Sequence, residues 1–285
     1  MQLSHDAFLA ICRIVHDLCG IVIAADKQYL IKSRLEPVLH KNHLPSYEAL
    51  VERLKLPNSL TIQDQIVEAI TTKETSFNRD SHPFEELKRS ILPELAARLF
   101  ERKMSTGLAY PRCRIWCAAV ATGQEAYSLA MTISDFVAAR PMGGLSIDDF
   151  PILATDISQQ ALAVARDGQY TAAELGRGIG AEQREKYLKP KDGAWVIQPA
   201  IRRMVEFRRI NLVHPLPDLG TFDLILCRNI LIYFDETLRR RLCQNFYSAL
   251  NPKGLLMIGA AESLYGVSDA FKLEHFGRTV VYRKP

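Results

Sequence analysis

The stretch Arg114-Ile-Trp-Cys-Ala-Ala-Val-Ala-Thr-Gly-Gln-Glu-Ala-Tyr-Ser128 decides the fold of most of this chain. An apolar run typical of a buried strand passes through a turn of small residues directly into a helical pattern. Such a turn lets the backbone approach a nucleotide-like ligand closely. Gly123 is its one glycine, so the G-x-G-x-x-G pattern of dehydrogenases is absent. Taken alone, the stretch fits an ordinary strand-to-helix turn equally well.

Two acidic residues strengthen the nucleotide interpretation. Glu125 lies in the first turn of the expected helix, at the positive end of its dipole. A second apolar strand, Phe150-Pro-Ile-Leu-Ala-Thr155, ends on Asp156. An acid at that place can hold the two ribose hydroxyls of an adenosine. The sequence therefore predicts a nucleoside site at the carboxyl ends of these strands.

A third motif, Thr221-Phe-Asp-Leu-Ile-Leu-Cys-Arg-Asn-Ile-Leu-Ile-Tyr-Phe-Asp235, places more polar residues at the same edge. Residues 222–226 are typical of a buried strand, and Arg228, Asn229 and Tyr233 follow it. In open α/β sheets, ligands bind outside the carboxyl ends of the strands. We therefore expect these side chains beside Glu125 and Asp156.

Together with Thr72-Lys-Glu-Thr-Ser-Phe-Asn-Arg79, these motifs resemble the chemotaxis receptor glutamate O-methyltransferases, the CheR family, which use S-adenosylmethionine. The resemblance extends through Asn211-Leu212 to Gly259-Ala-Ala-Glu-Ser263, covers nearly the whole chain and keeps the family's motif order. It implies an α/β, Rossmann-like class I methyltransferase domain with a small β-rich insertion, preceded by a small all-helical domain.

The expected organisation has three parts, with bounds set by periodicity and by Gly and Pro breaks. They are an all-helical domain of about four helices at 1–80, a linker helix and connection at 81–111, and the methyltransferase domain at 112–285, with its insertion at about 170–209. Within the insertion we expect two short strands, at 194–198 and 204–208. A terminal hairpin is expected at 272–282.

The resemblance also implies the residues of the active site. Arg79 and Tyr233 are expected to be catalytic, because a guanidinium fork and a phenol can steer a substrate carboxylate. Asp156 would bind ribose, Glu125 the ammonium group, and Asn211 with Leu212 the adenine. The full expected cofactor set is Lys73, Thr75, Arg79, Gly123, Glu125, Asp156, Asn211, Leu212, Arg228 and Asn229. The product would be S-adenosylhomocysteine.

Three positions depart from the usual pattern of the family. Lys73 replaces a small polar residue, Gln124 replaces an acid, and Asn78 replaces a phenylalanine. A cation near a sulfonium site opposes binding unless it points away or meets the cofactor carboxylate. These departures predict weaker cofactor binding. They also leave open an alternative function, a catalytically weak adaptor that binds S-adenosylmethionine or S-adenosylhomocysteine in a chemosensory pathway.

The implied partners are the cytoplasmic helices of methyl-accepting chemotaxis receptors. The basic residues Lys27, Lys32 and Arg34 lie on one expected helix, which in the family meets acidic receptor helices. A solvated helix face explains them equally well on charge alone. Some members dock a receptor C-terminal pentapeptide on a Gly-x-Gly loop, whereas the matching loop Lys189-Pro-Lys-Asp-Gly193 has one glycine. We therefore expect no pentapeptide tether.

Composition narrows the class further. The net charge of +4 over 285 residues does not indicate nucleic acid binding. The excess of positive charge is concentrated at residues 176–209, which hold nine basic and four acidic residues. That segment is either a docking surface for an acidic partner or a solvated region. No apolar run nears the roughly 20 residues that span a bilayer. Six cysteines without a C-x-x-C pair suggest buried free thiols and no metal. We expect a cytoplasmic monomer.

Overall fold

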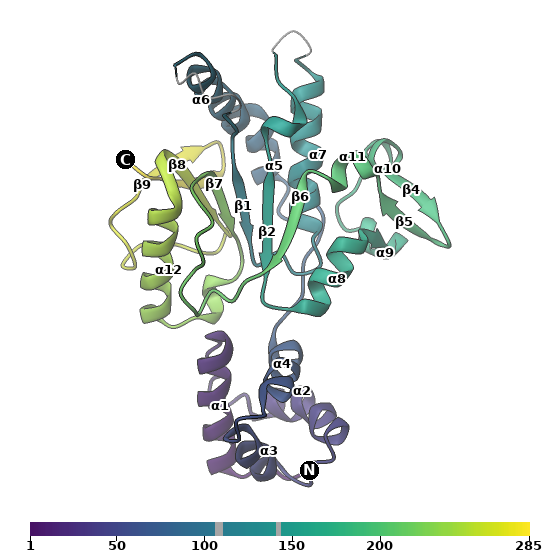
Figure 1. Cartoon of the computed structure of the whole chain (residues 1–285), viewed down its shortest axis with the longest axis vertical. Coiled ribbons are helices and arrows are strands. Elements are labelled where there is room, and N and C mark those ends of the chain that lie inside the picture. Colours follow the sequence, from purple (N-terminus) through teal and green to yellow (C-terminus); the bar gives the residue numbers. More distant parts are fainter. Residues whose placement is uncertain (106–110, 141–143) are drawn as a thin grey trace.

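The computed structural model describes residues 1–105, 111–140 and 144–285. A small helical domain occupies one end of the molecule, and a larger α/β domain carries the insertion at its side (Figure 1). In the described part of the chain, no helix is both long enough and apolar enough to cross a membrane. The expected α/β fold with a preceding helical domain and a small β insertion is confirmed.

The helical domain contains four helices within residues 1–80, all of which are described. They are α1 (His5–Cys19), α2 (Gln28–Lys41), α3 (Tyr47–Leu54) and α4 (Leu60–Ile70). Apolar residues at helical spacing, such as Phe8, Ile11 and Val15 of α1, are buried in a core of the domain's own. Gly20, in the left-handed conformation at φ 74°, ends α1 and turns the chain toward the α/β domain.

A nearly continuous helical segment follows, where a linker helix was expected. It consists of α5 (His82–Glu86), the π-helix η1 (Leu87–Ile91) and α6 (Leu92–Ser105). The expected connection up to residue 111 includes residues 106–110, which lie outside the described residues.

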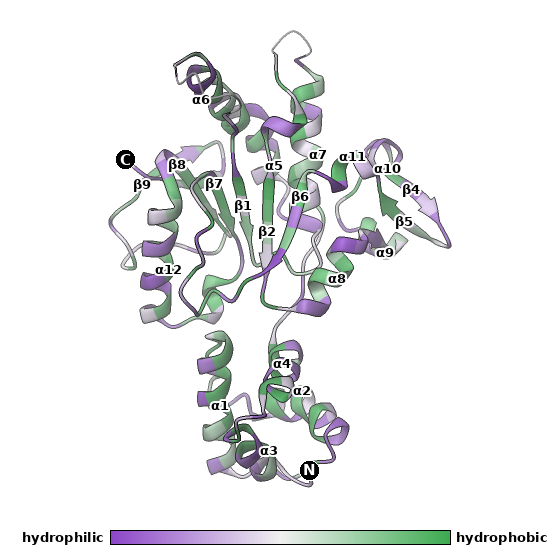
Figure 2. Ribbon diagram, viewed as in Figure 1, coloured by the Kyte–Doolittle hydropathy of each residue, from purple (hydrophilic) through white to green (hydrophobic). Residues whose placement is uncertain are grey.

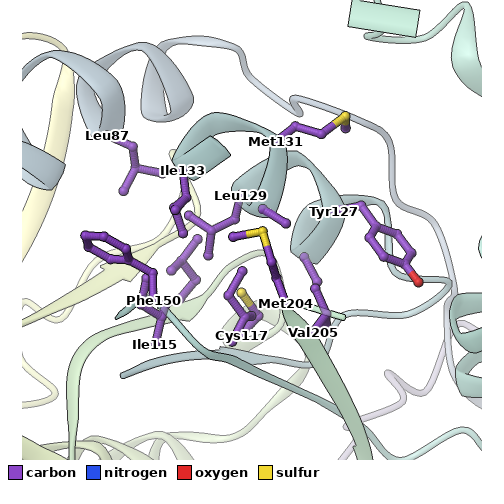
Figure 3. Close-up of a cluster of buried hydrophobic side chains, with 14 of the residues drawn as sticks. Leu87, Ile115, Cys117, Tyr127, Leu129, Met131, Ile133, Phe150, Met204 and Val205 are labelled. Atoms are coloured by element: carbon purple, nitrogen blue, oxygen red, sulfur yellow. The ribbon is translucent and has the colours of Figure 1, made fainter. Parts of the chain in front are cut away.

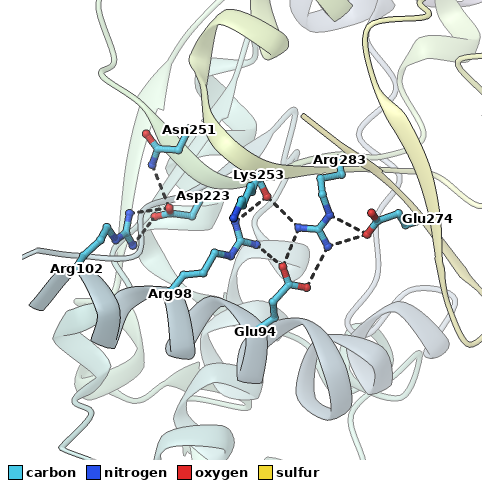
Figure 4. Close-up of polar contacts among 8 residues, drawn as sticks. All are labelled: Glu94, Arg98, Arg102, Asp223, Asn251, Lys253, Glu274 and Arg283. Carbon is cyan, nitrogen blue, oxygen red and sulfur yellow. Dashed lines mark hydrogen bonds and ion pairs between the residues drawn. The ribbon is translucent and has the colours of Figure 1, made fainter. Parts of the chain in front are cut away.

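Charged contacts fasten α6 to the sheet (Figure 4). Glu94 accepts hydrogen bonds from Arg98 at 2.7 Å and from Arg283 near the C-terminus at 2.7 and 3.0 Å. Arg102 pairs with Asp223 at 2.8 Å, and the side chain of Asp223 is buried. These contacts anchor the linker segment to the opposite end of the chain.

The main sheet has the order β6-β2-β1-β7-β8-β10-β9 in the described residues. Its strands are β1 (Ile115–Ala118), β2 (Ile152–Asp156), β6 (Val205–Arg209), β7 (Phe222–Cys227), β8 (Leu250–Ile258), β9 (Lys272–Phe276) and β10 (Thr279–Arg283). The first five are parallel, and β10 and β9 form the expected antiparallel hairpin. Strand β8 contains an irregularity near its start, where its register to β7 shifts.

Helices cover both faces of this sheet. They include α7 (Gln124–Ala138), α8 (Gln159–Asp167) and α12 (Glu236–Ala249), with short 3-10 turns η3 (Ile147–Asp149) and η4 (Leu231–Tyr233). Side chains of α7 such as Leu129 and Ile133 pack with Ile115 and Cys117 of β1 (Figure 3). Trp116, pointing to the other face of β1, packs in the core formed with α12. The central strands and the inner sides of the helices are accordingly hydrophobic (Figure 2).

The insertion contains a three-stranded antiparallel sheet of order β3-β5-β4. Its elements are β3 (Gln169–Tyr170), α9 (Ala172–Leu175), α10 (Ala181–Tyr187), β4 (Leu188–Lys191), β5 (Ala194–Ile197) and α11 (Pro199–Arg202). Our placement of residues 204–208 in this insertion is wrong, because β6 is the edge strand of the main sheet, parallel to β2. Its alternating pattern predicts a strand with one buried face, but does not say which sheet the strand joins.

Candidate active site

A cavity of about 310 Å³ lies at the carboxyl ends of β1, β2, β6 and β7 and is covered by the helical domain. Its lining comes from the helical domain and the segment after it, from the ends of the strands, and from the loop after β7. The lining residues are Cys19, Ile21, Thr71, Thr72, Glu74, Thr75, Arg79, Ala119, Val120, Ala121, Glu125, Asp156, Ile157, Ile210, Asn211, Leu212, Val213, Arg228, Asn229, Ile230, Ile232, Tyr233 and Phe234. This size and mixed lining are typical of a small-molecule site.

The turn between β1 and α7 brings backbone to the cavity. Ala119 and Ala121 have left-handed conformations, at φ 61° and 49°, which small residues adopt with less strain than bulky ones. Gly123 also has a positive φ of 93°, but it is not among the lining residues. A Cβ there would lie 2.8 Å from that of Ala165 in α8, so Gly123 serves the packing of the turn.

Asp156 supports this turn from the end of β2. Its Oδ2 accepts the N–H of Ala121 at 2.7 Å and its Oδ1 that of Ser158 at 2.8 Å. Burial raises the pKa of Asp156, and these two backbone N–H groups oppose that rise. Each carboxylate oxygen can accept a second hydrogen bond. Asp156 can therefore hold the turn and a ligand hydroxyl together.

A buried ion-pair cluster lies on another wall. Arg228, whose side chain is 1% exposed, pairs with Glu125 at 2.9 Å and with Asp80 at 2.8 Å. Burial raises the pKa of Glu125, while the neighbouring guanidinium of Arg228 lowers it. A carboxylate held in this way presents negative charge to the cavity, where a cationic ligand group can meet it.

Glu262 is a site residue that the sequence reasoning missed. Its carboxylate accepts N–H groups from Asn229 and Leu231 at 2.8 Å each and from Gly259 at 2.6 Å. It thereby fixes the loop after β7, in which Asn229 is left-handed at φ 59°. The motif from Gly259 to Ser263 was part of the family resemblance. No pattern in the sequence near Glu262, however, indicates that its carboxylate holds the loop after β7.

The helical domain is attached directly beside the cavity. Ile21 forms an isolated β-bridge with Phe234, and the N–H of Val22 donates to the carbonyl of Tyr233 at 2.9 Å. Asn211 donates to the carbonyl of Leu18 at 2.8 Å. Several lining residues therefore come from the helical domain, and periodicity within that domain could not have identified them.

Comparison with known proteins decides the family. The model of the CheR methyltransferase all-alpha domain matches residues 6–71, and that of the CheR methyltransferase SAM binding domain matches residues 73–280. This chain belongs to the CheR methyltransferase family. The expected family is thus confirmed, and S-adenosylmethionine (SAM) is the cofactor of the CheR catalytic domain.

Relatives of similar length support the CheR assignment. The chain is 38% identical to chemotaxis protein methyltransferase 1 of Pseudomonas aeruginosa over 266 residues, 93% of each chain. It is 37% identical to chemotaxis protein methyltransferase 1 of Vibrio cholerae, covering 99% of this chain and 98% of that one. Identity to the chemotaxis protein methyltransferase of Salmonella typhimurium is 30%, with 98% and 91% covered.

The cavity fits the CheR cofactor. S-adenosylmethionine carries a sulfonium and an ammonium group, and two buried acidic residues, Glu125 and Asp156, line the cavity. In the described residues, no group of three His, Cys, Asp or Glu is placed to hold a metal ion. Five of the six cysteines are buried, and all six are free thiols.

The structure brings most of the expected CheR site residues together. Thr75, Arg79, Glu125, Asp156, Asn211, Leu212, Arg228, Asn229 and Tyr233 line the cavity. Lys73 does not line it, and its Nζ pairs with Glu68 at 2.7 Å. Glu68 also accepts from the hydroxyl of Ser158, so Lys73 belongs to the contact between the two domains. The exposed residues Lys27, Lys32 and Arg34 lie at the start of α2, outside the cavity lining.

Proposed function

We propose that this chain transfers the methyl group of S-adenosylmethionine to glutamate side chains on cytoplasmic helices of chemotaxis receptors, giving glutamyl methyl esters. The observation that carries this proposal is that Arg79 and Tyr233 line the same cavity as Glu125 and Asp156. Arg79 donates to the carbonyl of Glu74 at 3.4 Å, a long and weak bond. The other N–H groups of Arg79 can donate hydrogen bonds to a substrate carboxylate.

The chemistry needs little from the protein beyond positioning. The cofactor supplies an electrophilic methyl group on its sulfonium. A glutamate side chain, with an ordinary pKa near 4.3, is already ionised at neutral pH and needs no general base. Arg79 would grip the carboxylate and Tyr233 would donate one hydrogen bond, holding an oxygen in line for attack. Orientation of this kind can supply roughly 7–11 kcal/mol.

Cofactor contacts are assigned in the same proposal. Asp156 would accept the ribose hydroxyls, Glu125 would contact the ammonium group, and Asn211 with Leu212 would line the adenine.

The domain bounds 1–80, 81–111 and 112–285 also remain our proposal, with the insertion now ending before β6.

Arg79→Ala and Tyr233→Phe should each lower kcat by about ten- to a hundredfold and leave cofactor affinity nearly unchanged, because their proposed contacts are to the methyl-accepting carboxylate. Transfer of tritium from labelled cofactor to receptor membranes measures kcat, and calorimetry measures cofactor affinity. Arg79→Lys, which keeps the charge but loses the planar fork, should recover only part of the rate. Tyr265→Phe, at a 94% exposed tyrosine, is the matched control. Loss of affinity with normal kcat would reassign both residues to the cofactor.

The same assay tests the alternative function of a weak adaptor. Base-labile label on receptor supports the enzyme, and binding of S-adenosylhomocysteine without transfer supports the adaptor. The adaptor alternative rested partly on the expected position of the Lys73 cation near the sulfonium. The ion pair of Lys73 with Glu68 weakens that reason. Gln124 and Asn78 remain as departures from the family pattern.

For receptor recognition we propose electrostatic capture by Lys27, Lys32 and Arg34, in a cytoplasmic monomer that has no pentapeptide tether. All three side chains are exposed, and Arg34 donates to the carbonyl of Ala69 at 3.2 Å. Exposed charges are screened within about 8 Å at physiological ionic strength.

Methylation should therefore fall as salt rises, and Lys32→Glu with Arg34→Glu should lower kcat/KM for receptor about tenfold or more at low salt. Arg13→Glu with Lys55→Glu, the same double charge reversal at two exposed residues of the helical domain, is the control. Added receptor C-terminal pentapeptide should change nothing. Tight, salt-insensitive binding of that peptide would show that tethering carries recognition.

A further inference from the structure

We propose that Asn78 is a positioning residue that fixes Arg79 in the active site by linking it to the β insertion. This inference rests on the catalytic role proposed above for Arg79. It deepens that role by assigning a task to the insertion within the reaction itself, separate from any receptor docking.

The first observation is backbone strain around Arg79. Asn78, Asp80 and Ser81 all have left-handed conformations, at φ 46°, 67° and 45°. Residues other than glycine adopt this region rarely, and it persists where surrounding contacts hold it. Asn and Asp tolerate it better than other side chains. The backbone on both sides of Arg79 is therefore held in place by its neighbours.

The second observation is the set of contacts made by Asn78. Its backbone N–H donates to the hydroxyl of Ser128 in α7 at 2.9 Å. Its side-chain amide donates to the carbonyl of Gly178 at 2.8 Å and to Oε1 of Gln183 at 2.9 Å, both in the insertion. Both donors of the amide are thus used. A carboxylate or an apolar side chain at this position could not replace them.

The insertion approaches this segment as closely as backbone allows. A Cβ on Gly178 would lie 1.9 Å from the carbonyl oxygen of Phe77, so any larger residue would push the two apart. Phe77 is fully buried and packs edge-on against Tyr170 of β3, with the two ring centroids 5.0 Å apart. Tyr170 in turn donates to the carbonyl of Thr122 in the β1–α7 turn. The segment before Arg79 is held between the insertion and the cofactor side of the cavity.

The residues after Asn78 are held from the opposite direction. Arg228 donates to the carbonyl of Arg79 at 3.0 Å and pairs with Asp80 at 2.8 Å. Arg79 is therefore fixed by Arg228 on its C-terminal side and by Asn78 on its N-terminal side. A phenylalanine at position 78 would offer neither the amide donors nor the tolerance of a left-handed backbone.

Asn78→Gly tests the inference, because glycine keeps the left-handed backbone and removes both amide donors. We expect kcat to fall about tenfold while cofactor affinity stays within about twofold, since small displacements of a positioning group cost rate. Asn78→Asp should behave alike, and Gln183→Leu removes one of the contacts from the insertion side. Asp192→Gly, the same kind of change at a left-handed residue of the β4–β5 turn (φ 48°), is the matched control.

The deciding measurement repeats Asn78→Gly in an Arg79→Ala background. If Asn78 acts through Arg79, its effect on kcat disappears there. An equal loss in both backgrounds, or a normal kcat for Asn78→Gly, Asn78→Asp and Gln183→Leu while Arg79→Ala is slow, would overturn the inference and leave the proposed function intact. A normal kcat for Arg79→Ala would reject the role of Arg79 itself, and the inference with it.

Discussion

Arg228→Ala should lower the free energy of unfolding by about 3–5 kcal/mol, because it leaves the buried carboxylate of Glu125 without its counter-charge. The Arg228 side chain is 1% exposed and that of Glu125 is 11% exposed. The substitution also removes the hydrogen bond from Arg228 to the carbonyl of Arg79 and the ion pair with Asp80. Denaturant unfolding at neutral pH measures the loss. Arg13→Ala, at an exposed arginine of α1, should change stability by about 0.5 kcal/mol or less.

The pH dependence of this loss has a definite sign. Burial already raises the pKa of Glu125 in the folded protein, and removal of the Arg228 guanidinium raises it further. An acid with a raised folded pKa destabilises the fold increasingly as the pH rises from its unfolded pKa to its folded pKa, and costs nothing below both values, where both states are protonated. The deficit of Arg228→Ala should therefore shrink as the pH is lowered. Glu125→Gln in the same variant should recover much of the deficit at neutral pH. A deficit independent of pH and of Glu125→Gln would contradict this account.

The central strands could be predicted because burial on both faces leaves an unbroken apolar run. Every residue of β1 and of β7 is buried. Parallel neighbours end at the same sheet edge, so polar residues just after such runs must gather there. Asp156 and Asn229 were placed by this argument, and both line the cavity.

Other parts of the site depend on contacts between segments distant in sequence. Glu262 is far along the chain from the N–H of Asn229, and Ile21 meets Phe234 only because the helical domain folds over the sheet. Lys73 was assigned to the cofactor through the family resemblance, yet it pairs with Glu68 of α4. Strand β6 was assigned to the wrong sheet for a related reason, since alternation specifies a buried face and not its partner.

The cofactor assignment leads to the remaining large effect, on binding. Asp156→Ala should weaken S-adenosylhomocysteine binding by about 1.5–3 kcal/mol, because hydrogen bonds to a charged acceptor are stronger than average. The substitution also removes the acceptor for the N–H groups of Ala121 and Ser158, so affinity alone would not prove a ribose contact.

A ligand lacking the ribose hydroxyls separates the two effects. Wild-type protein should bind the 2′,3′-dideoxy analogue of S-adenosylhomocysteine more weakly than the parent compound, while Asp156→Ala should bind both alike. Because burial raises the pKa of Asp156, this preference for the hydroxyls should fade on acidification at a higher pH than an ordinary aspartate would give. Titration calorimetry with both ligands across pH measures each quantity. If the folded variant still distinguished the ligands as wild type does, the ribose would be held elsewhere, and Asp156 would serve only the β1–α7 turn.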